Sequence, residues 1–308
     1  MKMKEIIDLF REESALSVRS ETLRYDDCQF QALLKHFGEE YELGALTKPV
    51  VMSYIQTCKS SNNKNSTINK HLKMLYRLMR YAVENEYVDV TNELEKTYAQ
   101  IYRLGTLKDD CQSYRTLSDH QTESLVNYID SLKEDKFISL RNKIILSIML
   151  GTGARRNEVV HIKRSNIDYD NNSIYLETTK TGITRHIYID DVLKEQISKL
   201  IQLMDTLGYN TETEYLFISH QNKCRLTIQG VDEIFRKLKK TLGFTVTPHM
   251  LRHTFATECV ENEIPLSSLQ QLMGHTRLST TQIYIHLADK RLKKDALRYN
   301  PLTTRRAV

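Results

Sequence analysis

The sequence contains only five cysteines, and none of them forms the Cys-x-x-Cys pair typical of zinc sites and redox motifs. They are scattered along the chain, at Cys28, Cys58, Cys111, Cys224 and Cys259. This spacing indicates neither a disulfide framework nor a cysteine-based metal site. It predicts reduced, mostly buried thiols.

Long apolar runs are also missing. No stretch approaches the roughly 20 apolar residues of a membrane-spanning helix. Lys2, Lys4 and Glu5 bring charge into the N-terminus too early for a signal peptide. We therefore expect a soluble cytoplasmic protein without a membrane partner.

No cluster of acidic residues has the spacing of metal ligands, so we expect neither a metal nor a cofactor. A phosphate would then be neutralised by side-chain cations rather than by magnesium. The net charge is only +5, and basic and acidic side chains balance within residues 1–105. Net charge therefore supports nucleic-acid binding weakly, and local clusters of cations are more informative.

The most informative stretch lies between residues 247 and 286, where His249, Arg252, His275 and Tyr284 follow one another. A guanidinium offers paired donors to two phosphate oxygens, and histidine can donate a hydrogen bond or carry a proton. Tyrosine supplies an oxygen nucleophile, although its reference pKa of about 10 means that nearby positive charge is needed to favour the oxyanion. These residue types suit phosphate chemistry.

The same stretch predicts short helices joined by turns. Thr247 and Pro248 suit a helix start, with threonine as the cap and proline as the first helical residue. Gly274 suits the end of a second helix over 266–273. A further helix over 280–286 would carry Tyr284.

The motifs His-x-x-Arg-His, Leu-Met-Gly-His and Ser-Thr-Thr-Gln-Ile-Tyr, in this order and spacing, resemble the C-terminal signature of tyrosine site-specific recombinases, near the Xer and phage-integrase branch. The resemblance implies that Tyr284 is the nucleophile and that His249, Arg252 and His275 surround the scissile phosphate. His253, within the first motif, is as well explained as a core or surface histidine.

The family also requires an earlier arginine and a lysine. A Thr-Gly-x-Arg-x-x-Glu turn after an apolar helix matches Arg155 as the first phosphate-binding arginine and Glu158 as a supporting carboxylate. Arg156 is the next candidate, but adjacent residues on a helix point about 100° apart, so only one faces the phosphate. Two β-branched and aromatic runs flank a turn that contains Lys180, which predicts a hairpin. The resemblance makes Lys180 the general acid for the leaving 5′ hydroxyl.

The implied reaction is attack by Tyr284 on a DNA phosphodiester, giving a 3′-phosphotyrosyl link. Arg155, Arg252 and His275 would hold the non-bridging oxygens, and His249 would manage the tyrosine proton. A 5′ hydroxyl of the partner DNA then reverses the step without ATP.

The expected fold is mainly α with a small β-sheet: a helical N-terminal core-binding (SAM-like) domain over 1–105, a linker over 106–116 and an α+β catalytic domain over 117–308. We expect N-terminal helices over 20–37, 47–58, 66–85 and 92–104, and a linker that lets the two domains close around a duplex. In the catalytic domain we expect helices near 118–132, 139–150, 191–207 and 228–242, and a strand over 215–219. A helix over 287–299 either packs on its own domain or docks into a neighbouring subunit.

Cations on one face of the helix over 66–85 are candidate DNA contacts, although such a run usually marks a solvated face. These are Lys70, Lys73, Arg77 and Arg80, and Arg225 at a later helix entrance is a further candidate.

The expected partners are double-stranded DNA with paired inverted-repeat half-sites, three further copies of the chain in a homotetramer on synapsed DNA, and an accessory protein as a further candidate. The location would be the nucleoid. The role would be dimer resolution, or integration and excision of a mobile element. Two alternatives remain: relaxation of DNA in the manner of a type IB topoisomerase, and a non-catalytic DNA-binding accessory role.

Overall fold

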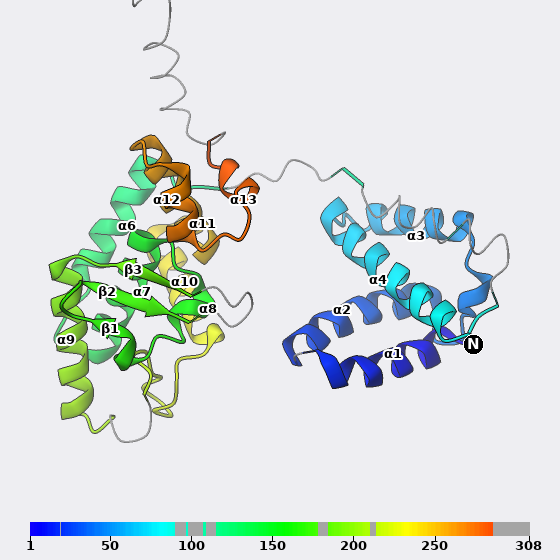
Figure 1. The fold of residues 1–308 in the computed structure, drawn as a ribbon, viewed down its shortest axis with the longest axis horizontal. Helices are drawn as coiled ribbons and strands as arrows, with labels where there is room; N and C mark the ends of the chain where they lie inside the picture. The colour runs from blue at the N-terminus through cyan, green and yellow to red at the C-terminus, as the bar shows by residue number, and fades with distance from the viewer. Residues whose placement is uncertain are drawn as a thin grey trace, which may run out of the picture. The chain divides into compact units, whose positions relative to one another are not determined.

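The computed structural model describes residues 1–18, 20–89, 97, 107–108, 115–177, 184–209 and 214–285. The chain forms two compact units, Met1–Ser113 and Tyr114–Val308 (Figure 1). It is mainly helical with a small sheet, which confirms the predicted fold class. The expected helices over 92–104 and 287–299 and most of the expected linker lie outside the described residues.

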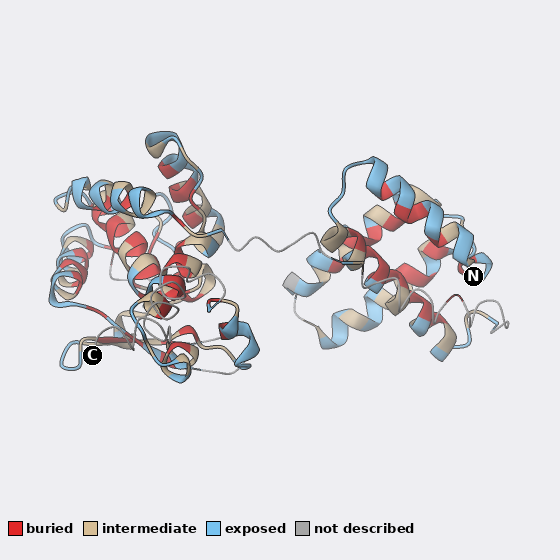
Figure 2. Ribbon diagram, turned by 90° about the horizontal axis from the view of Figure 1, so that it is seen from above, coloured by how far each residue is buried: buried red, intermediate tan, exposed pale blue. Residues whose placement is uncertain are grey.

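The N-terminal unit packs its helices around α4. In its described part the elements are α1 (Met3–Ser17), α2 (Ser20–Phe37), η1 (Leu43–Ala45), α3 (Lys48–Ser60) and α4 (Asn65–Glu84). Helix α4 contacts α1, α2 and α3. Its predicted apolar stripe is buried at Ile68, Leu72, Leu75 and Met79, and Figure 2 shows buried residues on the inward faces of this unit.

Helix α1 was not predicted as a separate element. Its buried residues, Met3, Ile6 and Ile7, follow the three- and four-residue spacing of a helix face. The stripe is narrow, and the charges around it obscure the period.

The C-terminal unit combines helices with a three-stranded antiparallel sheet in the order β1-β2-β3. Its described helices are α6 (Asp119–Ser131), α7 (Phe137–Thr152), α8 (Arg156–Val159), α9 (Asp191–Thr206), α10 (Ile228–Leu242), α11 (Pro248–Glu261), α12 (Leu266–Met273) and α13 (Ser279–Gln282), with η2 at Arg164–Asn166. The strands are β1 (Ile167–Asp168), β2 (Ser173–Leu176) and β3 (Arg185–Tyr188).

Helix α7 forms the centre of this unit. It is apolar around most of its circumference, and it packs against both α9 and α11. Ile174 and Ile187 bring the sheet into the same core. The predicted hairpin is present as the β2–β3 pair, with Ser173 opposite Tyr188 and Leu176 opposite Arg185. Its tip, residues 178–183, lies outside the described residues.

Three details differ from the sequence predictions. The expected strand over 215–219 is wrong: Tyr215 and Ile218 form only isolated bridges, because each pairs with a single residue of an irregular segment. Cys28 and Cys224 are exposed, so the thiols are less buried than predicted. Helix α13 ends at Gln282, and Tyr284 lies in the turn after it.

Candidate active site

The turn between α7 and α8 positions Arg155. Gly153 ends α7 in a left-handed conformation with φ of 63°, and a Cβ at this position would lie 2.6 Å from the Phe255 ring. Glycine alone suits both conditions. Arg155 then caps α8: its backbone N–H donates to Glu158 Oε2 at 2.7 Å and its Nη1 to Glu158 Oε1 at 2.8 Å. Its Nη2 reaches the Gly274 carbonyl oxygen at 3.4 Å, so the side chain, 38% exposed, lies beside the end of α12.

Arg156 points elsewhere. Its Nη1 forms an ion pair with Asp232 of α10. The two neighbouring arginines therefore diverge, Arg155 toward α12 and Arg156 toward α10.

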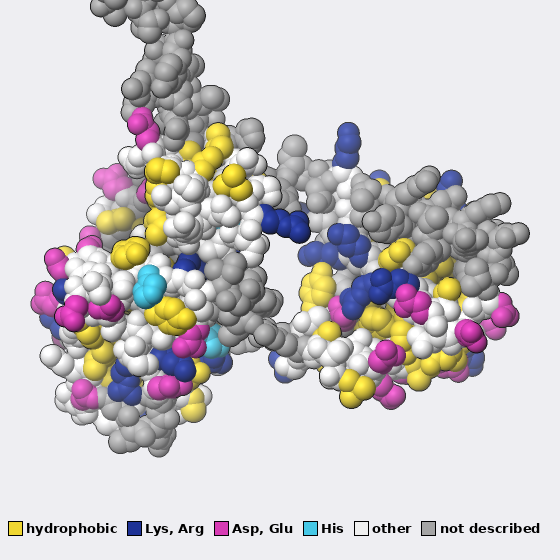
Figure 3. Space-filling view, in the orientation of Figure 1, with side chains coloured by type: hydrophobic (Ala, Val, Ile, Leu, Met, Phe, Trp, Pro, Cys, Tyr) yellow, Lys and Arg dark blue, Asp and Glu magenta, His cyan; other side chains and the backbone are white. Residues whose placement is uncertain are grey.

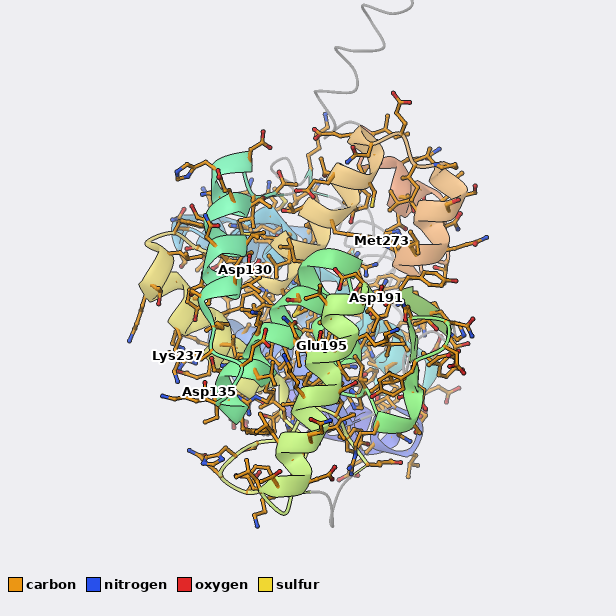
Figure 4. All side chains as sticks on the ribbon, turned by 90° about the vertical axis from the view of Figure 1, so that its left-hand side faces the viewer. Asp130, Asp135, Asp191, Glu195, Lys237 and Met273 are labelled. Atoms are coloured by element: carbon orange, nitrogen blue, oxygen red, sulfur yellow. The ribbon has the colours of Figure 1, made fainter. Side chains whose placement is uncertain are left out.

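Arg252 lies at the centre of the site. Thr247 Oγ1 accepts the Met250 N–H at 3.2 Å and starts α11, as predicted. One turn into the helix, the Arg252 side chain is almost fully buried. Its Nη1 donates to the Gly153 carbonyl at 2.6 Å and its Nη2 to the Met273 carbonyl at 2.6 Å. Figure 4 labels Met273 at the end of α12, above Asp191 and Glu195 of α9 in that view.

His275 joins Arg252 to α13. Gly274, with φ of 61°, ends α12 as predicted, and His275 follows. Arg252 Nη2 donates to His275 Nε2 at 2.9 Å. Since arginine has no acceptor, Nε2 is unprotonated in this contact and the ring proton is on Nδ1, which donates to Thr281 Oγ1 at 2.9 Å.

Burial and neighbouring cations set the charges of these two groups. Burial, reinforced by Arg155, lowers the pKa of Arg252 to about 9, which leaves it cationic near neutral pH. Burial, followed by the charge of Arg252, lowers the pKa of His275 to about 4. His275 is therefore neutral near neutral pH, in agreement with the tautomer assigned above.

Tyr284 is only 2% exposed. Its hydroxyl lies 3.0 Å from His253 Nδ1, and its ring is parallel to that of His275, with centroids 6.4 Å apart. The residue brought to the tyrosine hydroxyl is therefore His253, for which the sequence indicated no catalytic role. Burial, then His249 and Arg252, lower the pKa of His253 to about 4.

His249 is exposed on the first turn of α11. Partial burial, followed by Arg156, Arg252 and Arg155, lowers its pKa. A neutral imidazole beside several arginines can accept a proton. His253 follows one turn later, with ring centroids 6.5 Å apart.

Arg185, the first residue of β3, is a buried cation that was not predicted from the sequence. Its Nη1 and Nη2 donate to Glu158 Oε1 and Oε2 at 2.7 and 2.9 Å. Burial alone would raise the pKa of Glu158, but the hydrogen bonds and charges of Arg185 and Arg155 lower it. Strand β3 alternates buried and exposed residues, with Arg185 and Ile187 inward. A charge at an inward strand position was the signal that could have identified it.

A groove of about 650 Å³ runs between β3 and α12 and ends at Gly274 and His275. It is lined on one side by Thr184, Arg185, His186 and Tyr188, and on the other by Ser267, Ser268, Gln270, Gln271 and Leu272. His275 therefore lines one part of an open groove. Lys180 itself lies outside the described residues.

The proposed DNA contacts of α4 differ among themselves. Lys70, Lys73 and Arg80 are exposed, and Figure 3 shows Lys and Arg side chains gathered on the face of this unit that carries α4. Arg77, in contrast, donates to both carboxylate oxygens of buried Asp26 at 3.1 Å. This ion pair connects α4 to α2, and the charge of Arg77 is already neutralised by Asp26.

Arg225 precedes α10 in the C-terminal unit. Its guanidinium lies 5.2 Å from the centre of the Tyr215 ring, and the side chain is partly exposed. It lies near a helix entrance, as predicted.

Among the described residues, no group of three or more His, Cys, Asp or Glu side chains has the arrangement of a metal site. In the same part of the chain, no helix has the length and apolar character needed to cross a bilayer.

The chain is similar to known proteins in sequence and in fold. Residues 115–291 match the model of the phage integrase family. The chain is 27% identical to the tyrosine recombinase XerD of Oceanobacillus iheyensis, covering 83% of each chain. It is also 27% identical to XerA of Pyrococcus furiosus, covering 92% of this chain and 98% of the relative. A structure of the XerH recombinase on a palindromic difH substrate, a post-cleavage complex, shares the fold with a TM-score of 0.71 and 21% identity, over 89% of this chain and 79% of the other.

Proposed function

The chain belongs to the phage integrase family, and from this premise we propose that Tyr284 breaks and rejoins DNA through a covalent 3′-phosphotyrosyl link. The protein is a tyrosine site-specific recombinase. The observation that carries the proposed site is convergence: Arg155, Arg252, His275 and Tyr284 come from four separate segments and meet in one cluster. Topoisomerase activity and a purely accessory role are not favoured, since the similar proteins are recombinases.

Arg155 and Arg252 supply the positive charge for the scissile phosphate. Arg252 remains cationic near neutral pH, and its buried position strengthens its attraction for an anion. Charge on the phosphate oxygens grows as the tyrosine attacks, so fixed cations stabilise the transition state more than the bound substrate.

His275 donates to a phosphate oxygen only after its present hydrogen bonds change. In the free protein Nε2 accepts from Arg252, and Nδ1 carries the proton. A phosphate that takes the Arg252 donor would free Nε2, and its negative charge would favour protonation there. Phosphate binding and protonation of His275 would then be coupled.

We infer that Tyr284 leaves its buried position before it attacks, because in the free protein its hydroxyl is hydrogen-bonded to His253 inside the domain. We assign the contact with His253 to the resting protein and the proton transfer to His249. Movement of the segment that contains α13, residues 276–285, would release the tyrosine.

The two histidines can be separated by matched substitutions. We expect His249→Gln to lower the first-order rate of covalent complex formation by about 10²-fold, the usual contribution of a general base. His253→Gln is expected to leave that rate within about tenfold, since it removes only a resting contact. Single-turnover assays on a nicked target duplex measure both. A larger loss for His253→Gln would transfer the proton-accepting role to His253.

Lys180 is proposed as the general acid for the leaving 5′ hydroxyl. The assignment rests on its place in the motif, between β2 and β3, outside the described residues. A DNA with a 5′ sulfur leaving group, which needs no proton, would restore cleavage to a Lys180→Ala protein.

The N-terminal unit is proposed as the core-binding domain, with Lys70, Lys73 and Arg80 on backbone phosphates. Such contacts position a protein without reading sequence. Arg77 is a weaker candidate because Asp26 already binds it. Arg225 would add a backbone contact in the C-terminal unit.

Replacing Lys70, Lys73 and Arg80 together with glutamine should weaken DNA binding and lower the slope of log affinity against log salt by roughly 0.9 for each lost contact. The matched control replaces Lys35, Lys48 and Lys59, which are exposed cations of other helices in the same unit. Filter binding at several salt concentrations measures both proteins. Equal slopes in the two triple variants would remove α4 from the proposed interface.

We further propose that the protein acts as a homotetramer on paired inverted-repeat half-sites, in dimer resolution or in integration and excision of a mobile element. An accessory protein and association with the nucleoid belong to this proposal. The expected docking segment over 287–299 lies outside the described residues.

The deciding experiment incubates the protein with fragmented genomic DNA of its source organism. After denaturation, covalently attached DNA is captured and sequenced. We expect ends that accumulate at one dyad-symmetric site, whose location separates dimer resolution from element mobility. Binding of duplex DNA without any covalent capture would contradict the proposed chemistry.

A further inference from the structure

We propose that Arg185 is a positioning residue for DNA cleavage. It holds the Glu158 carboxylate, and through Glu158 it holds Arg155, in a fixed position relative to the end of α12, which His275 follows. The inference rests on the proposed function of this site. It concerns a side chain outside the recombinase motifs that identified the site.

The Glu158 carboxylate is shared by two arginines. Oε1 accepts Nη1 of Arg155 at 2.8 Å and Nη1 of Arg185 at 2.7 Å. Oε2 accepts the Arg155 backbone N–H at 2.7 Å and Arg185 Nη2 at 2.9 Å. Four donors thus fix the carboxylate, so its orientation, and that of Arg155, depends on Arg185.

The same guanidinium holds the end of α12. Arg185 Nε donates to the Leu272 carbonyl at 2.7 Å, three residues before His275. Gly274 packs against Arg185 so closely that a Cβ there would lie 3.0 Å from Nη1. One planar group therefore connects β3, α8 and α12, the elements that carry or flank Arg155 and His275.

Charge and geometry both favour arginine here. Arg185 is 6% exposed, and a buried cation is tolerated only when it is paired and hydrogen-bonded, as this one is. Lysine would keep the charge, but it lacks the planar fork needed to bind both carboxylate oxygens and the Leu272 carbonyl together. Arg185→Lys should therefore loosen the site rather than remove its charge.

The test measures first-order covalent complex formation on a nicked duplex of the captured target site, at saturating DNA. We expect Arg185→Lys and Arg185→Gln to lower the rate constant by about 10²-fold, because small misplacements of phosphate-binding groups are costly. DNA affinity should change by less than about threefold. Protein that stays unfolded during the measurement lowers the amplitude and not the first-order rate constant, so a loss of folded protein is distinguished from a loss of cleavage rate.

Arg141 supplies the matched control. It is also a buried arginine of this unit, and its Nη1 donates to the Ile218 carbonyl at 2.7 Å, away from Glu158. Arg141→Lys should leave the cleavage rate constant within about threefold of wild type.

Two readouts separate positioning from general stability. In an Arg155→Ala background, Arg185→Lys should cost less than it does in the wild-type background, because the part of its effect that acts through Arg155 is already lost. The acidic limb of the pH–rate profile should also move to higher pH in Arg185→Lys. Glu158 faces Arg155, Arg185 and Arg252, and a poorer ion pair lets burial raise the pKa of Glu158. His275, which Arg185 also acts on, would shift in the same direction if that charge moves away.

The result for the wild-type protein separates failure of the proposed function from failure of the proposed role of Arg185. If wild type forms no covalent complex, the function proposed for the site fails. If wild type cleaves and both Arg185 variants cleave within about threefold of it, only the role of Arg185 is overturned. Fully multiplicative losses in the Arg155→Ala background, with an unmoved acidic limb, would also overturn it.

Discussion

The Tyr284→Phe protein should bind its DNA site normally and form no covalent complex, a loss of more than about 10⁴-fold in cleavage rate. Phenylalanine keeps the ring that packs in the cluster formed by α11 and α12 and lies parallel to His275. It removes only the nucleophilic oxygen. Binding is retained because the phosphate contacts come from cations. Losing the hydrogen bond to His253 should lower the free energy of unfolding by roughly 1 kcal/mol.

Tyr209→Phe provides the control. Tyr209 is also a buried tyrosine of this unit whose hydroxyl is bonded to a histidine, 2.7 Å from His220 Nδ1. Gel-shift assays and denaturing gels of covalent adducts measure both variants. Covalent adducts from Tyr284→Phe, or their loss from Tyr209→Phe, would show that the nucleophile is misassigned.

Arg155→Ala is expected to lower the cleavage rate by about 10³-fold, whereas Arg156→Ala should stay within about tenfold of wild type. The reason is geometric: Arg155 lies beside Gly274 and shares Glu158 with Arg185. Arg156 forms a partly exposed ion pair with Asp232. Each substitution removes one positive charge at nearly the same place in the chain. A difference in cleavage rate between the two variants therefore reflects where each arginine side chain lies.

Single-turnover cleavage at saturating DNA compares the two arginine variants, and a thermal denaturation curve of each confirms that the fold is retained. If Arg156→Ala proves the more damaging, the phosphate faces the α10 side of the turn and the motif register is displaced by one residue.

Strong local patterns were predicted well from the sequence. Helix α10 has the predicted bounds, Ile228–Leu242, because Val231, Ile234, Phe235 and Leu238 form an uninterrupted buried stripe. The caps at Thr247 and Gly274 were found because each has a local physical signature. The recombinase motifs then located four residues that the structure brings together.

Features that depend on distant contacts were not predictable in this way. The partner of the Tyr284 hydroxyl is set by the packing of α13 on α12 and of Tyr284 in the hydrophobic cluster of α11 and α12, so no spacing rule identifies His253. Arg185 meets Glu158 across 27 residues of chain. Residues 215–219 look like a strand by composition, but strand formation requires a continuous neighbour, which the described chain does not place beside them.

The anchored tyrosine has a kinetic consequence. Two hydrogen bonds, from His275 to Thr281 and between His253 and Tyr284, hold the nucleophile inside the domain. At roughly 1 kcal/mol each, these two bonds alone make the released state about thirtyfold less populated, and burial of the Tyr284 ring lowers its population further. The observed cleavage rate is then the intrinsic rate multiplied by this small population. A DNA that raises the population accelerates its own cleavage, and a DNA that binds without doing so is left intact, so the equilibrium of one short segment contributes to target discrimination.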